Sequence, residues 1–123
     1  MNKVLEFNLQ FAVGKGYFHE NEKIDLSKVI NELDTVASKM FDEGKHYISG
    51  MLVENRFCYK KDWGCPEGGE RGLTYTSSAN PEFVEDEAKW KQDCLEFSKK
   101  IKETFGQSTV TVTFKETDFY YLK

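Results

Sequence analysis

Apolar and polar residues alternate at the beginning of the chain. Between residues 3 and 13 the apolar side chains fall on odd positions, at Leu5, Phe7, Leu9, Phe11 and Val13. Successive side chains of a strand point to opposite faces of its sheet, so this spacing predicts a half-buried β-strand. Gly14 and Gly16 follow it and predict its end.

A helical spacing of apolar residues replaces the alternation after residue 25. Apolar positions recur one, three and four residues apart, at Val29, Ile30, Leu33, Val36, Ala37, Met40 and Phe41. This spacing predicts a helix with one apolar stripe. Asp25 or Ser27 is the expected N-terminal cap, and Gly44 is expected to end the helix.

Two further strands are predicted in the middle of the chain. Residues 46 to 59 have apolar side chains on both faces, which favours a central position in the sheet, or a partner contact over part of the strand. Residues 73 to 77 form a shorter alternating run. Residues 60 to 72 hold four of the nine glycines and Pro66, so regular structure is expected to break there.

A second helix and a last strand complete the pattern. Asn80 is the expected cap, with Pro81 at the first helical position. The apolar stripe of this helix comprises Phe83, Trp90, Cys94, Phe97, Ile101 and Phe105. A strand is predicted from Ser108, and its alternation fails after Glu116, which indicates a β-bulge or a tail that docks elsewhere.

The predicted order is strand, helix, strand, strand, helix, strand. Each helix has a single apolar stripe, so both are expected to cover the same face of one sheet. We therefore predict the α+β class and a two-layer ferredoxin-like sandwich, with an antiparallel sheet and two helices on one face.

Composition and charge narrow the class of protein further. With 123 residues, 39% of them hydrophobic and 31% charged, the chain is expected to form one globular domain over residues 1–123. The net charge of −4 argues against nucleic acid as a partner, because such binding needs a basic face. The sequence contains no run of 18 apolar residues, so no membrane span is predicted. The first ten residues lack the apolar stretch of a signal peptide. Three scattered cysteines favour a reduced, cytoplasmic setting.

The loop over residues 60–72 is the leading candidate for a binding site. Its candidate residues are Trp63, Cys65, Gly68, Gly69, Glu70 and Arg71. Glycines let a ligand approach the backbone, tryptophan offers a flat face, and arginine offers a donor fork suited to phosphate or carboxylate. The alternative is a packed excursion in which Trp63 folds back over the sheet and the glycines only make turns.

No catalytic residue, metal site or cofactor is predicted. Cys65 would need His19 or His46 as a base to become a nucleophile, and nothing in the sequence brings either near it. Structural zinc sites usually have ligand pairs two to four residues apart, and six residues separate Cys58 from Cys65.

The C-terminal aromatic cluster is the second candidate contact surface. Phe119 and Tyr121, with their neighbours, suit a protein–protein contact. Alternatively, they close the open end of the sandwich over the first helix. An edge position of the last strand would also allow a homodimer through strand pairing.

Three segments of the chain resemble a known group of proteins. These are Trp63-Gly64-Cys65-Pro66 followed by Gly68-Gly69-Glu70, then Asn80-Pro81-Glu82-Phe83, then Gln107 to Val112. They look like a family of small uncharacterised proteins encoded by bacterial phages and integrated elements. The resemblance implies a bacterial intracellular setting, and it carries no known activity and no catalytic residue.

Two functions follow as hypotheses. The first is a non-catalytic interaction protein that binds a host protein, a second copy or a small signal molecule through the loop and the aromatic tail. The alternative is a small cytosolic enzyme that acts on a phosphorylated or carboxylated metabolite through the same loop.

Overall fold

The computed structural model describes residues 2–123, and its elements follow the predicted order. The elements are β1 (Lys3–Phe11), the short 3-10 turn η1 (Lys15–Tyr17), α1 (Leu26–Asp42), β2 (Met51–Phe57), the 3-10 turn η2 (Lys61–Trp63), β3 (Glu70–Ser78), α2 (Glu87–Thr104) and β4 (Thr111–Asp118). None of the helices in this part of the chain is long and apolar enough to cross a membrane.

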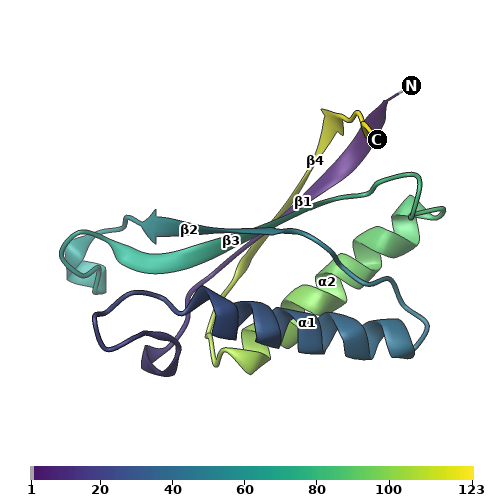
Figure 1. The fold of residues 1–123 in the computed structure, drawn as a ribbon. Helices are drawn as coiled ribbons and strands as arrows, with labels where there is room; N and C mark the ends of the chain where they lie inside the picture. Colours follow the sequence, from purple (N-terminus) through teal and green to yellow (C-terminus); the bar gives the residue numbers. More distant parts are fainter. Residues whose placement is uncertain (1) are drawn as a thin grey trace.

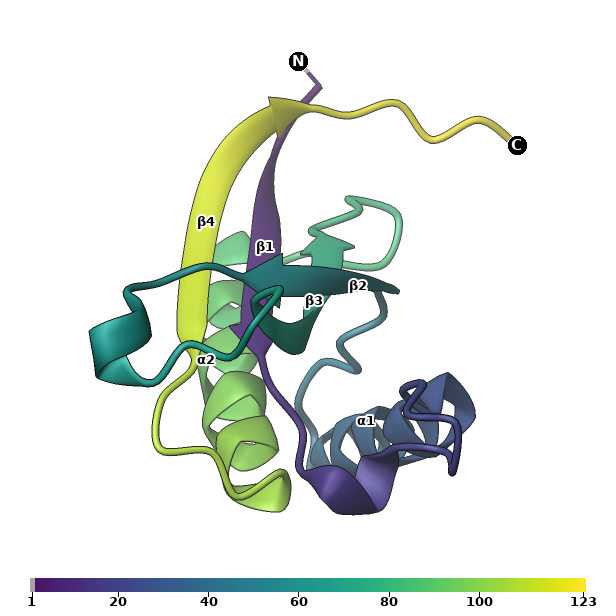
Figure 2. The same ribbon diagram turned by 90° about the vertical axis from the view of Figure 1, so that its left-hand side faces the viewer.

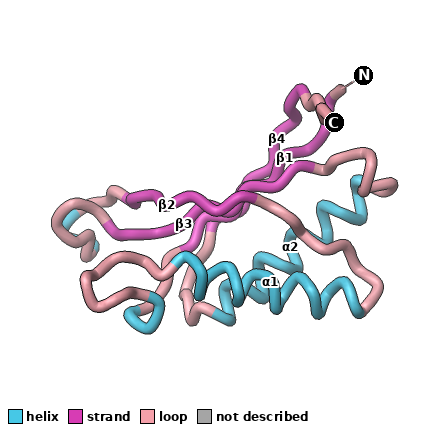
Figure 3. The backbone as a smooth tube through the Cα atoms, viewed as in Figure 1, coloured by secondary structure: helices cyan, strands magenta, loops and turns pink. Residues whose placement is uncertain are grey.

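The four strands form one antiparallel sheet in the order β2-β3-β1-β4. Both helices lie against one face of this sheet and leave the other face open (Figures 1 and 3). The predicted α+β two-layer sandwich is confirmed, and this strand order is that of the ferredoxin-like arrangement.

The central position predicted for the strand over residues 46–59 is wrong, because β2 lies at an edge of the sheet and starts only at Met51. The alternative of a partner contact over part of this strand stays a prediction. Residues 46 to 50 instead run across the helix layer, where Ile48 is fully buried. Met51 and Val53 remain largely exposed on the open face. The apolar residues on both faces of this segment therefore reflect a change of environment along it, and not a central strand.

The strand register separates the buried face of the sheet from the open one. Phe7 lies opposite both Ser77 and Phe114, and Phe11 lies opposite Leu73. The two helices pack on this buried face and form one core with it. Their buried core side chains are Val29, Leu33, Ala37, Met40, Trp90, Cys94, Phe97 and Ile101. Burial of each large apolar side chain contributes about 1.5–3 kcal/mol.

Helix α1 is capped as expected, whereas α2 begins later than predicted. The Asp25 carboxylate accepts a hydrogen bond from the Lys28 backbone N–H at 3.1 Å. In α2 the cap is Asp86, which accepts from the Lys89 N–H, and residues 81–83 form a turn. Phe83 is consequently 68% exposed and does not belong to the buried stripe.

Strand β4 curves along β1 and leads into a tail that turns away from the sheet (Figure 2). The Phe119 N–H donates to the Asn2 carbonyl, and the Tyr121 ring packs on Phe83 at a centroid distance of 6.1 Å. The alternative of a docked tail is thus confirmed. The tail covers the segment before α2, however, and does not close over α1.

Candidate functional site

Tyr59 and Glu70 form a polar pair where β2 and β3 separate into their connecting loop. Phe57 and Glu70 are register partners, and Tyr59 lies two residues beyond the end of β2. The Tyr59 hydroxyl donates a hydrogen bond of 2.9 Å to Glu70 Oε1. This hydrogen bond, together with desolvation, raises the pKa of Tyr59. The phenol therefore remains protonated at neutral pH and holds the carboxylate in place.

A hollow of about 370 Å³ opens beside this pair. Its walls come from the end of β1, from the β2–β3 ends and from the α2–β4 loop, and include Gln10, Phe57 and Thr111. This volume lies within the range of about 300–1,000 Å³ that is typical of small-molecule sites. The hollow combines a carboxylate, a phenol and the Phe57 ring, which are groups that attract an organic cation.

The predicted loop residues do not converge on one point. Trp63 is 75% exposed, so it does not fold back over the sheet. The Cys65 thiol contacts the carbonyl oxygens of Phe57 and Pro66. Gly68 and Gly69 have φ angles of +80° and +87°, and the Gly69 N–H closes a turn on the Pro66 carbonyl. A turn-forming role accounts for both glycines.

Glu70 and Arg71 were predicted to lie in the loop over residues 60–72, but in the structure they are the first two residues of β3. Successive residues of a strand point to opposite faces, and Arg71 shares its parity with the buried Leu73 and Tyr75. Glu70 therefore faces the open side of the sheet, and Arg71 faces the helix side.

Phe119 and Tyr121 lie at the other end of the molecule. They line a groove of about 460 Å³ with Tyr47, Met51 and Phe83. Figure 1 shows the C-terminus and the η2 loop at opposite ends of the sheet. The two predicted contact surfaces are thus separate, and one small ligand cannot span both.

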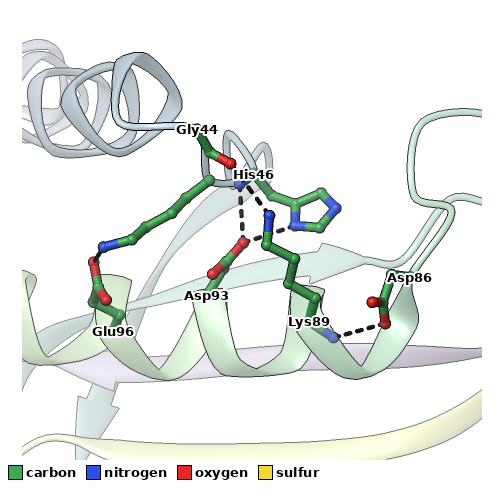
Figure 4. Close-up of polar contacts among 7 residues, drawn as sticks. Gly44, His46, Asp86, Lys89, Asp93 and Glu96 are labelled. Carbon is green, nitrogen blue, oxygen red and sulfur yellow. Dashed lines mark hydrogen bonds and ion pairs between the residues drawn. The ribbon is translucent and has the colours of Figure 1, made fainter.

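A histidine–aspartate pair is the polar feature that the sequence analysis missed. His46 lies in the α1–β2 connection, and its ring Nδ1 is 2.7 Å from Asp93 Oδ2 of α2. Lys45 pairs with Glu96, and the Lys89 ammonium donates to the Gly44 carbonyl (Figure 4). One signal for this pair was present in the sequence: Asp93 falls between Trp90 and Phe97 on the apolar stripe, where a charge needs a partner.

The two histidines, which were considered as bases or metal ligands, each lie beside a carboxylate far from Cys65 in the sequence. His46 is held by Asp93 and His19 lies 3.8 Å from Asp25, so each histidine has its own carboxylate. Among residues 2–123, no three His, Cys, Asp or Glu side chains are arranged to hold a metal ion.

Comparisons with known proteins place the chain in a family. A family model described as SAM lyase matches residues 2–123. Two solved structures of a phage SAM lyase are similar: the apo state has a TM-score of 0.66, and the complex with S-methyl-5'-thioadenosine has a TM-score of 0.63. Each shares 13% sequence identity and covers 94% of this chain and 82% of the other. No curated protein sequence matches this chain significantly.

These findings correct two expectations and support two others. A phage protein family is supported, but its activity is known, contrary to the expectation of an uncharacterised group. The expectation of a non-catalytic interaction protein is wrong, because the matching family is one of enzymes, and the alternative of a small enzyme agrees better. The chain belongs to the SAM lyase family.

Proposed function

We propose that this protein cleaves S-adenosylmethionine and releases S-methyl-5'-thioadenosine. The match of the family model to residues 2–123 carries the proposal. The Tyr59–Glu70 hollow supports it, because it offers a fixed carboxylate and aromatic groups to a substrate that contains a sulfonium cation. A cytoplasmic setting is part of the same proposal, since three free cysteines agree with a reducing compartment.

The chemistry of the product defines which bond breaks. S-Methyl-5'-thioadenosine retains the methyl and adenosyl groups, so the broken bond joins sulfur to Cγ of the amino-acid part. The bonding electron pair goes to sulfur, which changes from a sulfonium to a neutral thioether. The four-carbon fragment then needs a new bond at Cγ.

Two routes balance this cleavage without water. In the first, the carboxylate of the substrate attacks Cγ and forms homoserine lactone, with no proton released. In the second, a base removes a Cβ proton and the fragment leaves as vinylglycine. Because sulfur loses its positive charge in either route, a protein carboxylate beside the sulfonium would stabilise the bound substrate more than the transition state. The carboxylate therefore favours the reaction through a contact that the transition state keeps, with another cationic group or with a hydroxyl group of the substrate.

We assign Glu70 to anchor the substrate and Tyr59 to position Glu70. A hydrogen bond or ion contact to a charged group contributes about 1.5–3 kcal/mol. Each factor of ten in rate corresponds to about 1.4 kcal/mol, so loss of the Glu70 charge is expected to lower kcat/KM roughly 10- to 100-fold. Tyr59→Phe keeps the carboxylate and loses only its orientation, so a smaller loss is expected.

The experiment incubates the purified protein with S-adenosylmethionine and follows S-methyl-5'-thioadenosine by liquid chromatography. Lactone and vinylglycine are isomers, so proton NMR of the fragment and proton release in weak buffer distinguish the two routes. The matched control is Glu67→Gln, which removes an exposed carboxylate of the same loop that does not line the hollow.

The outcomes separate the function from the site. Absence of S-methyl-5'-thioadenosine with the folded wild-type protein would overturn the proposed function. Wild-type turnover in Glu70→Gln would leave the function standing and overturn the site assignment.

A further inference from the structure

The chain contains two arginines, and the fold places them opposite each other. Arg56 and Arg71 are register partners across the β2–β3 pair, and the other permanently charged basic side chains are fifteen lysines. Directly opposite residues on one face have Cβ atoms roughly 4.5–5.5 Å apart. Like charges at that distance destabilise a sheet, so the arrangement requires an explanation.

Neither guanidinium is neutralised within the described chain. No carboxylate oxygen of residues 2–123 lies within 4 Å of Arg56 or Arg71 in an ion pair. Arg56 donates one hydrogen bond to the Gly68 carbonyl at 3.3 Å, and the Arg71 guanidinium lies 5.8 Å from the centroid of the Phe18 ring. Because each guanidinium has five N–H donors, most donors of the pair remain available.

Both arginines face a hollow of about 880 Å³ between the β2 edge and the start of α1. Its other charged or titratable lining groups are His19, Lys23, Asp25 and Glu54. The Asp25 carboxylate already caps α1 and lies near His19. Glu54 is the other carboxylate of this wall and forms no ion pair within residues 2–123, beside the permanent positive charges of Lys23, Arg56 and Arg71. Both arginines also line an adjoining hollow with the carboxylates Glu20, Glu22, Glu67 and Glu70, none of which forms an ion pair with either guanidinium.

We propose that Arg56 and Arg71 together bind an oxyanion of the carboxylate or phosphate class. Two planar donor forks match the paired oxygens of such a group, and charge-assisted hydrogen bonds of this kind are among the strongest in proteins. A bound anion would also remove the repulsion between the two guanidinium groups. The Phe18 ring holds Arg71 from one side and the Gly68 carbonyl holds Arg56, so both forks are partly preorganised.

The hollow of about 880 Å³ shares no lining residue with the hollow proposed for S-adenosylmethionine cleavage, although Glu70 borders a further hollow of about 660 Å³ that both arginines line. Glu70 and Arg71 are consecutive residues of β3 and point to opposite faces of the sheet. The inference does not rest on the lyase activity, and its test uses no turnover measurement.

The first experiment is a titration of ¹⁵N-labelled protein with inorganic phosphate at constant ionic strength. Two arginine Nε–H signals are expected, and Arg56→Gln and Arg71→Gln assign them. We expect both signals to move and to saturate together. Absence of movement, or a linear drift without saturation, would overturn the proposal.

The second experiment measures the thermal midpoint of unfolding against phosphate. Phosphate stabilises most folded proteins by exclusion from their surface, so the informative quantity is the difference between variants. We expect a saturable additional shift in the wild type and in the exposed-lysine control Lys61→Gln, and its loss in Arg56→Gln and Arg71→Gln. Equal shifts in all four proteins would contradict a specific site.

Further arms of the test identify the ligand class and guard against misfolding. Titration with L-methionine in place of phosphate tests a carboxylate source, and tighter saturation by either probe identifies the class.

Without added anion, Arg71→Gln is expected to unfold at or above the wild-type temperature, because it removes a repulsion. If that variant does not fold, Arg71→Lys is used instead, because it keeps the charge and loses the guanidinium fork. We expect Arg71→Lys to bind phosphate at least threefold more weakly. Unchanged affinity would count against a role of the guanidinium fork.

Discussion

Asp93 Oδ2 accepts two hydrogen bonds from His46, one from the backbone N–H at 2.9 Å and one from the ring Nδ1 at 2.7 Å. A carboxylate can only accept here, so the Nδ1 atom carries the proton. Asp93 is buried in α2 and His46 lies in the α1–β2 connection. The pair therefore fastens this connection to the helix layer (Figure 4).

Asp93→Ala is expected to lower the free energy of unfolding by about 2–3 kcal/mol, because it leaves both His46 donors without a partner. Asp93→Asn keeps one acceptor oxygen and should lose about half as much. Urea unfolding measures both, with the exposed neighbour Gln92→Ala as the control. A stability of Asp93→Ala within 0.5 kcal/mol of wild type, an order-of-magnitude bound for neutral substitutions, would show that the pair is not important for stability.

Gly64 and Gly69 make a matched pair for testing strain in the β2–β3 loop. Both have positive φ, but a Cβ on Gly69 would lie 2.9 Å from the Phe57 carbonyl oxygen, whereas Gly64 has open space. Gly64→Ala is expected to cost about 1–2 kcal/mol from the backbone conformation alone. Gly69→Ala should cost at least ~1 kcal/mol more, since the strand ends must also move apart. Equal losses in chemical denaturation would argue against this close approach.

The three cysteines should differ sharply in their reaction with a thiol reagent. Cys58 is exposed, Cys65 is half-buried and Cys94 is fully buried, and burial raises the pKa of the Cys94 thiol. The thiolate is the reactive form. We expect Cys58 to react first, Cys65 more slowly, and Cys94 only on unfolding, as measured with Ellman's reagent on the Cys58→Ser and Cys65→Ser variants. Rapid labelling of Cys94 in the native protein would contradict the packing of α2.

Cys65 tests the thiol version of the enzyme hypothesis. Its Sγ contacts the carbonyl oxygens of Phe57 and Pro66. Cys65→Ala is therefore expected to retain the rate of S-methyl-5'-thioadenosine formation within about twofold, since removal of such weak contacts costs a few tenths of a kcal/mol. A loss of two orders of magnitude would make Cys65 a nucleophile candidate again.

Tyr47 should make the stability depend on pH at the alkaline end. Burial, followed by its 2.7 Å hydrogen bond to the Asp34 carboxylate, raises the pKa of Tyr47 from 10.0 to about 12. A pKa raised in the folded state contributes stability that is complete below pH 10 and is lost as the pH rises towards 12. Relative to Tyr47→Phe, the wild type should be more stable by about 1 kcal/mol at pH 8, as expected for one hydrogen bond.

This difference should shrink between pH 10 and pH 12, measured by urea unfolding with tyrosinate absorbance at each pH. Comparison with Tyr47→Phe removes the contribution of Tyr75, whose pKa is also raised by burial. A difference that stays constant across this range would show that Tyr47 titrates normally.

Much of the architecture could be predicted because short-range periodicity records burial. The alternation from Leu5 to Phe11 and the stripe from Trp90 to Ile101 both reflect one buried face. The prediction failed where a segment changes environment. Residues 46–50 leave the strand pattern to cross the helix layer, and Pro81 begins a turn five residues before the Asp86 cap of α2.

The candidate site shows the same division. Glu70 was among the residues predicted from the loop composition. The hydrogen bond between Glu70 and Tyr59 depends on the register of β2 and β3, and this register cannot be predicted from the types of neighbouring residues. The placement of Glu70 and Arg71 on opposite faces of the sheet likewise required the bounds of β3. His46 and Asp93 are 47 residues apart, so no local pattern could pair them.

By itself, the sequence determined the order of the elements and the face that each buries, because the periods of a strand and a helix are local properties of the chain. Tertiary structure alone decided which charged side chains meet. Strand register placed Arg56 opposite Arg71, and helix packing brought Asp93 to His46. Such contacts depend on the relative positions of distant segments, and only the folded chain defines those positions.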